Sequence, residues 1–472
     1  MAKSAEEIAN AMMALLYRFV SMASGDLDED PSDDPFVAWC KPGIPFAPED
    51  FRFAQFILKG QGATLAEKQA DAALQHSQAA GFSRFADFVP TVTGVEEGKI
   101  TEGVLRPGSA TLSGAYKRVI ESTQVAALQE PEDTNERIQQ LTAQAEPMRE
   151  AYEKHKLAYD NAFKEYIAAK VKTTYDPLAD LAFASEGAFL RSKAESADEA
   201  WEISGYKTQY QNLVAEIASL RARRSPAIWR QEVLQSYKNG SIGESAAFGD
   251  ARLTMPYPGS FATNVDGWTD FSFTTEHVDS LSTQKSSKWG ASGGFGWGSL
   301  KLGGGAEGSS TETLTINNTD NFSIRMRVAQ VPLLRGWFDP WFLRSQYWRF
   351  NPATELGHSG AVVSDGASPP SGLLSAYPIA AIFVRNVEIT MAELRDENSE
   401  LVKTLKAEGK GGWGFGVLNV GGSYERNSAE KKVLHDLSQG KLTVPGMQLV
   451  GVNCELVGQA PHPKQGLTWI GG

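Results

Sequence analysis

The side chains that could carry acid–base or metal chemistry are few and widely spaced. Six histidines occur, and none lies three to five residues from another, the spacing typical of zinc ligands on one element. The chain has no CxxC pair, no GxSxG nucleophile turn, no Walker A loop and no dinucleotide fingerprint. We therefore assign no catalytic residue and expect neither a metal nor a cofactor.

Two short clusters combine a histidine with carboxylates. His277 lies between Glu276 and Asp279, and His358 lies between Glu355 and Asp365. A histidine held by a carboxylate can act as a general acid or base. Solvated loops contain the same combination of residues, and we interpret both clusters in that way.

The most informative pattern is a glycine- and aromatic-rich segment that occurs twice. The copies are 293–304 (GGFGWGSLKLGG) and 411–422 (GGWGFGVLNVGG), in which Phe and Trp exchange places. Because alternate residues share one face of a strand, Phe295 and Trp297 lie on one side, and glycine occupies most of the other. Such a glycine face predicts the close approach of another backbone, a ring or a lipid surface.

The segments around each copy are polar, for example 274–287 and 306–313, which are rich in Ser, Thr, Glu and Lys. Trp and Phe among small residues suit a membrane interface. This combination resembles the β-hairpins of pore-forming proteins, which line a pore with polar residues and face lipid with apolar ones. Two such hairpins per subunit are found in perforin-like and gasdermin-like pore formers, and the resemblance implies oligomerisation followed by insertion.

The candidate contacts of these hairpins, with membrane or with a neighbouring subunit, are seven apolar residues. They are Trp289, Phe295, Trp297, Leu300, Trp413, Phe415 and Leu418. Three interpretations of the repeated segments remain open: packing within the chain, contact between subunits, and insertion into lipid.

A second aromatic run, 337–350 (WFDPWFLRSQYWRF), separates the two copies. Trp, Tyr and Arg dominate the energetic hot spots of protein interfaces. The run therefore predicts a patch for a partner, made of Trp337, Phe338, Trp341, Arg344, Tyr347 and Trp348. The alternative is a plug packed between the two repeats.

The elements that must position these segments begin with helices. Apolar residues recur at steps of three and four from Ile138 to Ala169 and again from Tyr206 to Leu220, around a break at Asp176 and Pro177. This pattern predicts an antiparallel helical hairpin, with 178–200 as its tip or third helix. An arm of about 35–40 residues would be roughly 50–60 Å long.

The expected fold is α+β and has three parts. A mixed, mainly helical N-terminal region (1–110) precedes a coiled-coil-like helical hairpin (111–235). From about residue 240 helical periodicity gives way to alternating strand patterns. The third part is a duplicated antiparallel β domain (240–472) with two Gly/aromatic β-hairpins, its repeats covering about 265–332 and 380–458.

Composition narrows the classes of protein. The 472 residues are 22% charged with a net charge of −12, which excludes collagen and a wholly disordered chain and argues against nucleic acid as a partner. No apolar run reaches the length of about 18 residues that a spanning helix needs. Two cysteines, Cys40 and Cys454, fit a reducing compartment. We expect a soluble protein, cytoplasmic as synthesised, with non-classical release as its route outward.

These patterns favour assembly over catalysis. The leading hypothesis is a non-enzymatic, pore-former-like protein that self-assembles, with a homo-oligomer and membrane lipid as its expected partners. The first alternative is a ring- or shell-forming scaffold that never enters lipid. The second is an enzyme whose site is assembled in the β domain from residues distant in sequence.

Overall fold

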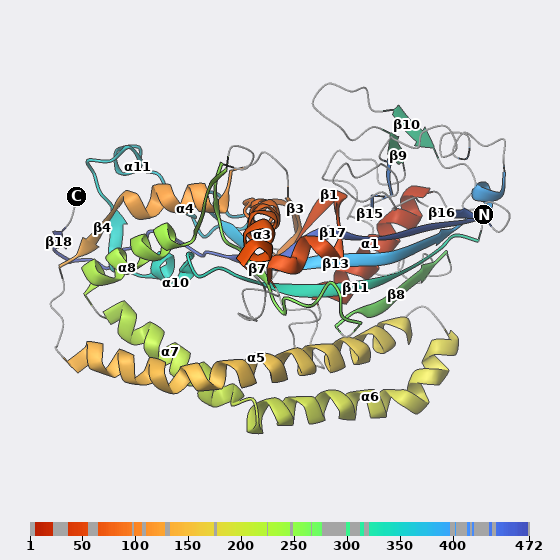
Figure 1. Cartoon of the computed structure of the whole chain (residues 1–472), viewed down its shortest axis with the longest axis horizontal. Coiled ribbons are helices and arrows are strands. Elements are labelled where there is room, and N and C mark those ends of the chain that lie inside the picture. Colours follow the sequence, from red (N-terminus) through yellow and green to blue (C-terminus); the bar gives the residue numbers. More distant parts are fainter. Residues whose placement is uncertain are drawn as a thin grey trace.

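The fold is α+β, as predicted, in the computed structural model (Figure 1). The structure describes residues 5–21, 36–54, 65–96, 99–105, 110–127, 133–173, 177–223, 225–245, 249–265, 267–275, 299–302, 312–315, 321–396, 402, 413–415, 418–419, 434–436 and 440–470.

A large, mostly antiparallel sheet forms the centre of the molecule. Its order is β2-β3-β1-β17-β13-β11-β7, with β8 also paired to β11 and β16 paired to β17. These strands are β1 (Phe36–Phe46), β2 (Thr91–Glu96), β3 (Lys99–Leu105), β7 (Met255–Pro256), β8 (Thr269–Thr274), β11 (Ser323–Leu334), β13 (Ala376–Thr390), β16 (Leu434–Asp436) and β17 (Lys441–Leu456). The N-terminal region joins this sheet, because β1 pairs with β17 along most of its length.

Four neighbouring strands of the sheet form an antiparallel meander, β8-β11-β13-β17. Their alternating apolar residues, such as Ile324, Met326 and Val328 of β11, are buried on one face. The register places Thr274, Ser323, Thr390 and Lys441 in a single row across the four strands. The segments 275–322 and 391–440, which contain the two repeat copies, therefore both connect strands at the same end of the meander.

A three-helix arm lies alongside this meander (Figure 1). It consists of α5 (Asp133–Thr173), α6 (Pro177–Ile203) and α7 (Lys207–Arg223). The 41 residues of α5 give a length of about 60 Å, and Pro147 lies inside this helix without ending it. Both α6 and α7 pack against α5, so the segment 178–200 is a third helix of the predicted hairpin.

The two faces of the sheet are covered by different helices. On one face, α1 (Ala5–Ser21) packs with Phe163 and Tyr166 of α5. On the other, Phe51 of η2 (Pro48–Phe51) and Phe82 of α3 (Leu65–Phe85) contact Phe383 of β13, as does Phe46 of β1. Burial of the sheet from both sides provides most of the core around β13 and β17.

A third core lies at the end of the molecule away from the tip of the arm. It is built from α4 (Leu112–Glu121), α8 (Pro226–Asn239), α10 (Pro340–Arg344), α11 (Glu355–His358) and a small sheet of β4 (Thr123–Ala126), β12 (Trp348–Phe350) and β18 (Trp469–Ile470). The remaining described elements are the hairpin of β5 (Ser241–Ser245) with β6 (Gly249–Arg252), the short helix η4 (Ala392–Arg395), and the strands of the repeats given below.

Candidate functional site

The described strands of the two repeat copies belong to one small sheet. β9 (Ser299–Leu302), from the first copy, pairs with β10 (Glu312–Thr315), which follows that copy in sequence, and within the second copy β14 (Trp413–Phe415) pairs with β15 (Leu418–Asn419). The copies are joined to each other, because β9 and β14 pair antiparallel with Trp413 opposite Leu302 and Gly414 opposite Lys301. This pairing makes the described strands of the two copies neighbours in one sheet.

The seven predicted contact residues fall into three groups. Trp289, Phe295 and Trp297 lie outside the described residues. For Leu300, Trp413 and Phe415 the structure gives the strand and its pairing. Leu418 is 0% exposed and belongs to the core formed by α1 and the large sheet, where β15 lies against β1 and β17. Its assignment as an outward contact is therefore wrong: Leu418 anchors the second copy to its own chain.

The meander is amphipathic at the end of its strands where the two segments begin and end. One face carries buried apolar side chains, namely Phe271, Phe273, Ile324, Ile389 and Leu442. On the opposite face, Ser272, Arg325, Glu388 and Thr443 are cross-strand neighbours. An ion pair between Lys441 and Glu388, with 2.8 Å between Nζ and Oε1, ties β17 to β13 on this polar face. A sheet with one apolar and one polar face can separate two different environments.

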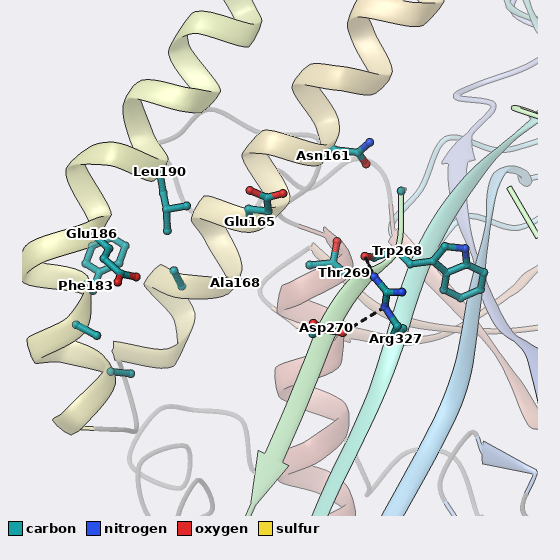
Figure 2. Close-up of a pocket in the computed structure, with 14 residues that line it drawn as sticks. Asn161, Glu165, Ala168, Phe183, Glu186, Leu190, Trp268, Thr269, Asp270 and Arg327 are labelled. Carbon is teal, nitrogen blue, oxygen red and sulfur yellow. Dashed lines mark hydrogen bonds and ion pairs between the residues drawn. The ribbon is translucent and has the colours of Figure 1, made fainter. Parts of the chain in front are cut away.

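The outer edge of β8 faces the arm. Within the described residues β8 pairs with β11 alone, and α5 lies against β8. A cavity of about 560 Å³ separates the tip half of the arm from the start of β8 (Figure 2). Its helical wall includes Ala168, Phe183 and Leu190, and its sheet wall includes Thr269 and Asp270. Ala168, Phe183 and Leu190 also pack against the core that contains Phe271 and Phe273, so the arm contacts the sheet beside the cavity but not across it.

Most of the charges around this cavity have partners. Asp270 Oδ1 lies 3.3 Å from Arg327 Nε, and Arg327 donates through Nη2 to the Trp268 carbonyl at 3.1 Å. On the arm, Glu165 of α5 pairs with Lys193 of α6. On β13, the guanidinium of Arg385 lies 4.0 Å from the centre of the Trp268 ring. Burial of this guanidinium, and to a smaller extent the charge of Arg327, lowers the pKa of Arg385.

Neither predicted acid–base cluster forms a proton-transfer site in the described residues. His277 and its neighbours lie outside them. His358 ends α11, and Glu355 reaches Arg118 at 3.9 Å. Asp365 accepts hydrogen bonds within its own loop from Ser371, which lower its pKa to about 2. The described part of the chain also contains no group of three or more His, Cys, Asp or Glu side chains that could hold a metal.

The predicted aromatic partner patch is wrong for most of its members. Trp337 and Trp348 are fully buried in the third core, where their indole nitrogens donate to the carbonyls of Leu253 and Leu343. Phe338 packs edge-on against Tyr116 and Tyr377, Tyr347 is half-buried, and Arg344 donates to the Leu456 carbonyl at 2.6 Å. Trp341, at 54% exposed, is the member that projects from the surface. Most of the run is therefore core of the third cluster, because its buried rings and donors find partners inside the chain. It does not lie between the two repeats, as the plug interpretation expected.

Lys164 of α5 is a feature that the sequence patterns did not reveal. It is 8% exposed, and burial lowers the pKa of its ammonium to about 8. Among the described residues no carboxylate forms an ion pair with it, and Asp160, one turn earlier, pairs with Lys156 at 2.8 Å. The heptad pattern accounts for the face of α5 that meets α6 and α7, and Lys164 lies outside that pattern.

Comparisons with known proteins add no relative. No protein-family description matches the chain, no curated protein is detectably similar to it, and no solved structure matches its fold. Among the described residues, none of the helices combines the length and apolar character needed to span a bilayer.

Proposed function

We propose that this chain is a non-enzymatic, pore-former-like protein that self-assembles and brings its two hairpin segments to a membrane or to neighbouring subunits. The observation that carries the proposal is the row formed by Thr274, Ser323, Thr390 and Lys441. Two segments of nearly equal length start and end at this row, on a meander with one apolar and one polar face.

The segments are long enough for the proposed role. A membrane-crossing β-strand needs about 9–11 residues, so a hairpin needs about 20. Both 275–322 and 391–440 exceed this length by a wide margin. Continuous extension of β8, β11, β13 and β17 through these segments would place four antiparallel strands per subunit in one sheet.

The number of strands also suits assembly through sheet edges. Because the meander has four alternating strands, β8 of one copy placed beside β17 of another continues the antiparallel order. In such a junction Phe273 would lie beside Leu442 on the apolar face. The outer side of β17 is paired with β16 at Lys441–Thr443 and with β1 farther along, at 447–454. The proposed junction therefore requires the three-residue strand β16 to leave β17 first.

The test is release of a dye from liposomes combined with substitution of the repeated tryptophans. Wild-type protein should release the dye, and Trp297→Ser/Trp413→Ser should abolish release while its helical circular dichroism stays unchanged. Trp341→Ser, which alters an exposed indole far from the repeats, is the matched control and should behave as wild type. If the double variant releases dye like wild type, the tryptophans do not act in assembly or insertion; if it unfolds, they are core residues.

The ring- or shell-forming scaffold is the second candidate, favoured by the pairing of β9 with β14 and the burial of Leu418. The first contact joins the two repeats to each other, and the second holds the second repeat on the body of the chain. For the scaffold we expect ring-shaped particles by negative-stain microscopy in the absence of lipid, with no dye release. For the pore former, we expect both the ring-shaped particles and the dye release only when lipid is present.

A further inference from the structure

We infer that the tip half of the arm, formed by α5 and α6, is a removable cover over β8 that controls when a strand of a second copy can pair with that edge. The identity of the partner rests on the proposed function. The movement of the arm is a property of the single chain and can be measured without assembly.

The arm is cohesive within itself. The rings of Tyr152 and Tyr210 lie 4.5 Å apart between α5 and α7, and Tyr159 stacks on Trp201 of α6 at 5.6 Å. The ammonium of Lys207 lies 4.6 Å from the centre of the Trp201 ring. Aromatic and cation–π pairs of this kind each stabilise by roughly 0.5–1.5 kcal/mol. These contacts join all three helices, so the arm can move as one body.

The junction between the arm and the body is looser. Phe163 and Tyr166 are the buried anchors of α5 on the sheet, and the cavity of about 560 Å³ lies beside them. A second cavity of about 190 Å³ separates the base of the arm, at Ala145 and Val214, from Trp341 of α10. Cavities mark places where packing contacts are missing, and both lie where the arm meets the rest of the chain.

The buried ammonium of Lys164 also weakens the docked position. Residues four apart on a helix lie on one side of it, and Ala168, one turn after Lys164, lines the cavity. Lys164 therefore lies on the side of α5 that borders the cavity. Its carboxylate neighbour Asp160 is already paired with Lys156, so burial of the Lys164 ammonium is costly, and lifting the arm would return it to water.

The edge that the arm covers is ready to pair. Thr269 and Asp270, at the start of β8, pair with β11 on their inner side and face α5 across the cavity on their outer side (Figure 2). Pairing with a second chain requires a strand to lie about 4.8 Å from β8, in space that the arm borders. Docking of the arm and addition of a strand are therefore mutually exclusive.

A reversible tether across the cavity tests this inference. In Ala168→Cys/Thr269→Cys, both new thiols line the cavity, and a bis-maleimide with a reducible disulfide in its linker joins α5 to β8. The native thiols should not react, because Cys40 and Cys454 are buried and burial raises the pKa of each, that of Cys40 to about 12. The control is the same double variant capped with N-ethylmaleimide.

The first readout is amide hydrogen exchange of β8 in the free protein. We expect the tether to slow exchange of β8 by about tenfold or more relative to the capped control, and reductant to restore it. Equal exchange in tethered and capped protein would overturn the inference, whatever the protein does on membranes.

The second readout is particle mass after incubation with liposomes. We expect the capped control to assemble, the tethered protein to remain monomeric, and reductant to restore assembly. Assembly of the tethered protein would overturn the cover. If the capped control and the wild type both stay monomeric while the tether slows exchange, the proposed function fails and the mobile arm stands.

Discussion

Replacing Lys164 by methionine should stabilise the protein at neutral pH. Methionine has a similar length and apolar stem but carries no charge to bury. The free-energy difference follows from the pKa of the ammonium, which burial lowers from 10.5 to about 8. This difference corresponds to about 3 kcal/mol of destabilisation of the folded wild type.

The sign of the pH dependence is fixed by the same values. Because the folded pKa is lower than the unfolded one, the wild type loses stability as the pH falls from about 10.5 to about 8, and below that this group adds no further change. Lys164→Met should therefore exceed the wild type in free energy of unfolding by about 3 kcal/mol at about pH 7. The advantage should shrink steadily above pH 8.

Urea denaturation at about pH 7 and about pH 9.5 measures this difference. Lys154→Met, which changes an exposed lysine of the same helix, is the matched control and should shift the free energy of unfolding by less than about 0.5 kcal/mol at either pH. A Lys164→Met variant that is no more stable than wild type at about pH 7, or equally advantaged at both pH values, would show that the ammonium of Lys164 does not destabilise the folded chain.

Three further predictions concern other parts of the structure and use the same denaturation assay. Burial raises the pKa of Asp87 to about 6 despite its hydrogen bonds from Ser113. The free energy of unfolding of the wild type should therefore fall by about 3 kcal/mol as the pH rises from about 4 to about 6, and Asp87→Asn should abolish this slope. An unchanged slope would contradict the assignment. Trp348→Ala should cost about 3–5 kcal/mol as a core truncation, whereas Trp341→Ala should cost less than about 1 kcal/mol; similar losses would contradict the placement of Trp348 in the third core. Gly357→Ala should cost about 1–3 kcal/mol, because its Cβ would meet the Asn351 carbonyl oxygen at 2.0 Å, and Gly336→Ala, which meets nothing within 4 Å, should not; equal stability of the two would contradict this packing.

The periodicity of apolar residues predicted the long helices of the arm and the alternating strands of the meander. Ile138, Leu141 and Ala145 of the heptad pattern are buried between α5 and α7, and the alternation along β11 is the one observed. The duplication also has a counterpart in space, since β8 with β11 and β13 with β17 each surround one Gly/aromatic copy. These features follow from spacings within a few turns or strand residues.

Features that depend on distant partners were not predictable in this way. The pairing of β1 with β17 joins residues more than 400 positions apart, and nothing in 36–46 identifies its partner. Leu418 carries the same pattern whether it faces lipid or α1, so only tertiary packing reveals its burial. Trp337 and Trp348 have the composition of an interface hot spot, but their donors and rings are satisfied within the chain. Burial of Lys164 likewise depends on where the arm docks.

The most direct test of the proposed self-assembly is the mass and shape of particles extracted in mild detergent after the full-length protein has been incubated with liposomes. We predict closed rings of many subunits, present only in samples that contained lipid and accompanied by dye release. A single 51.2 kDa species under all conditions, with liposomes left intact, would contradict the account.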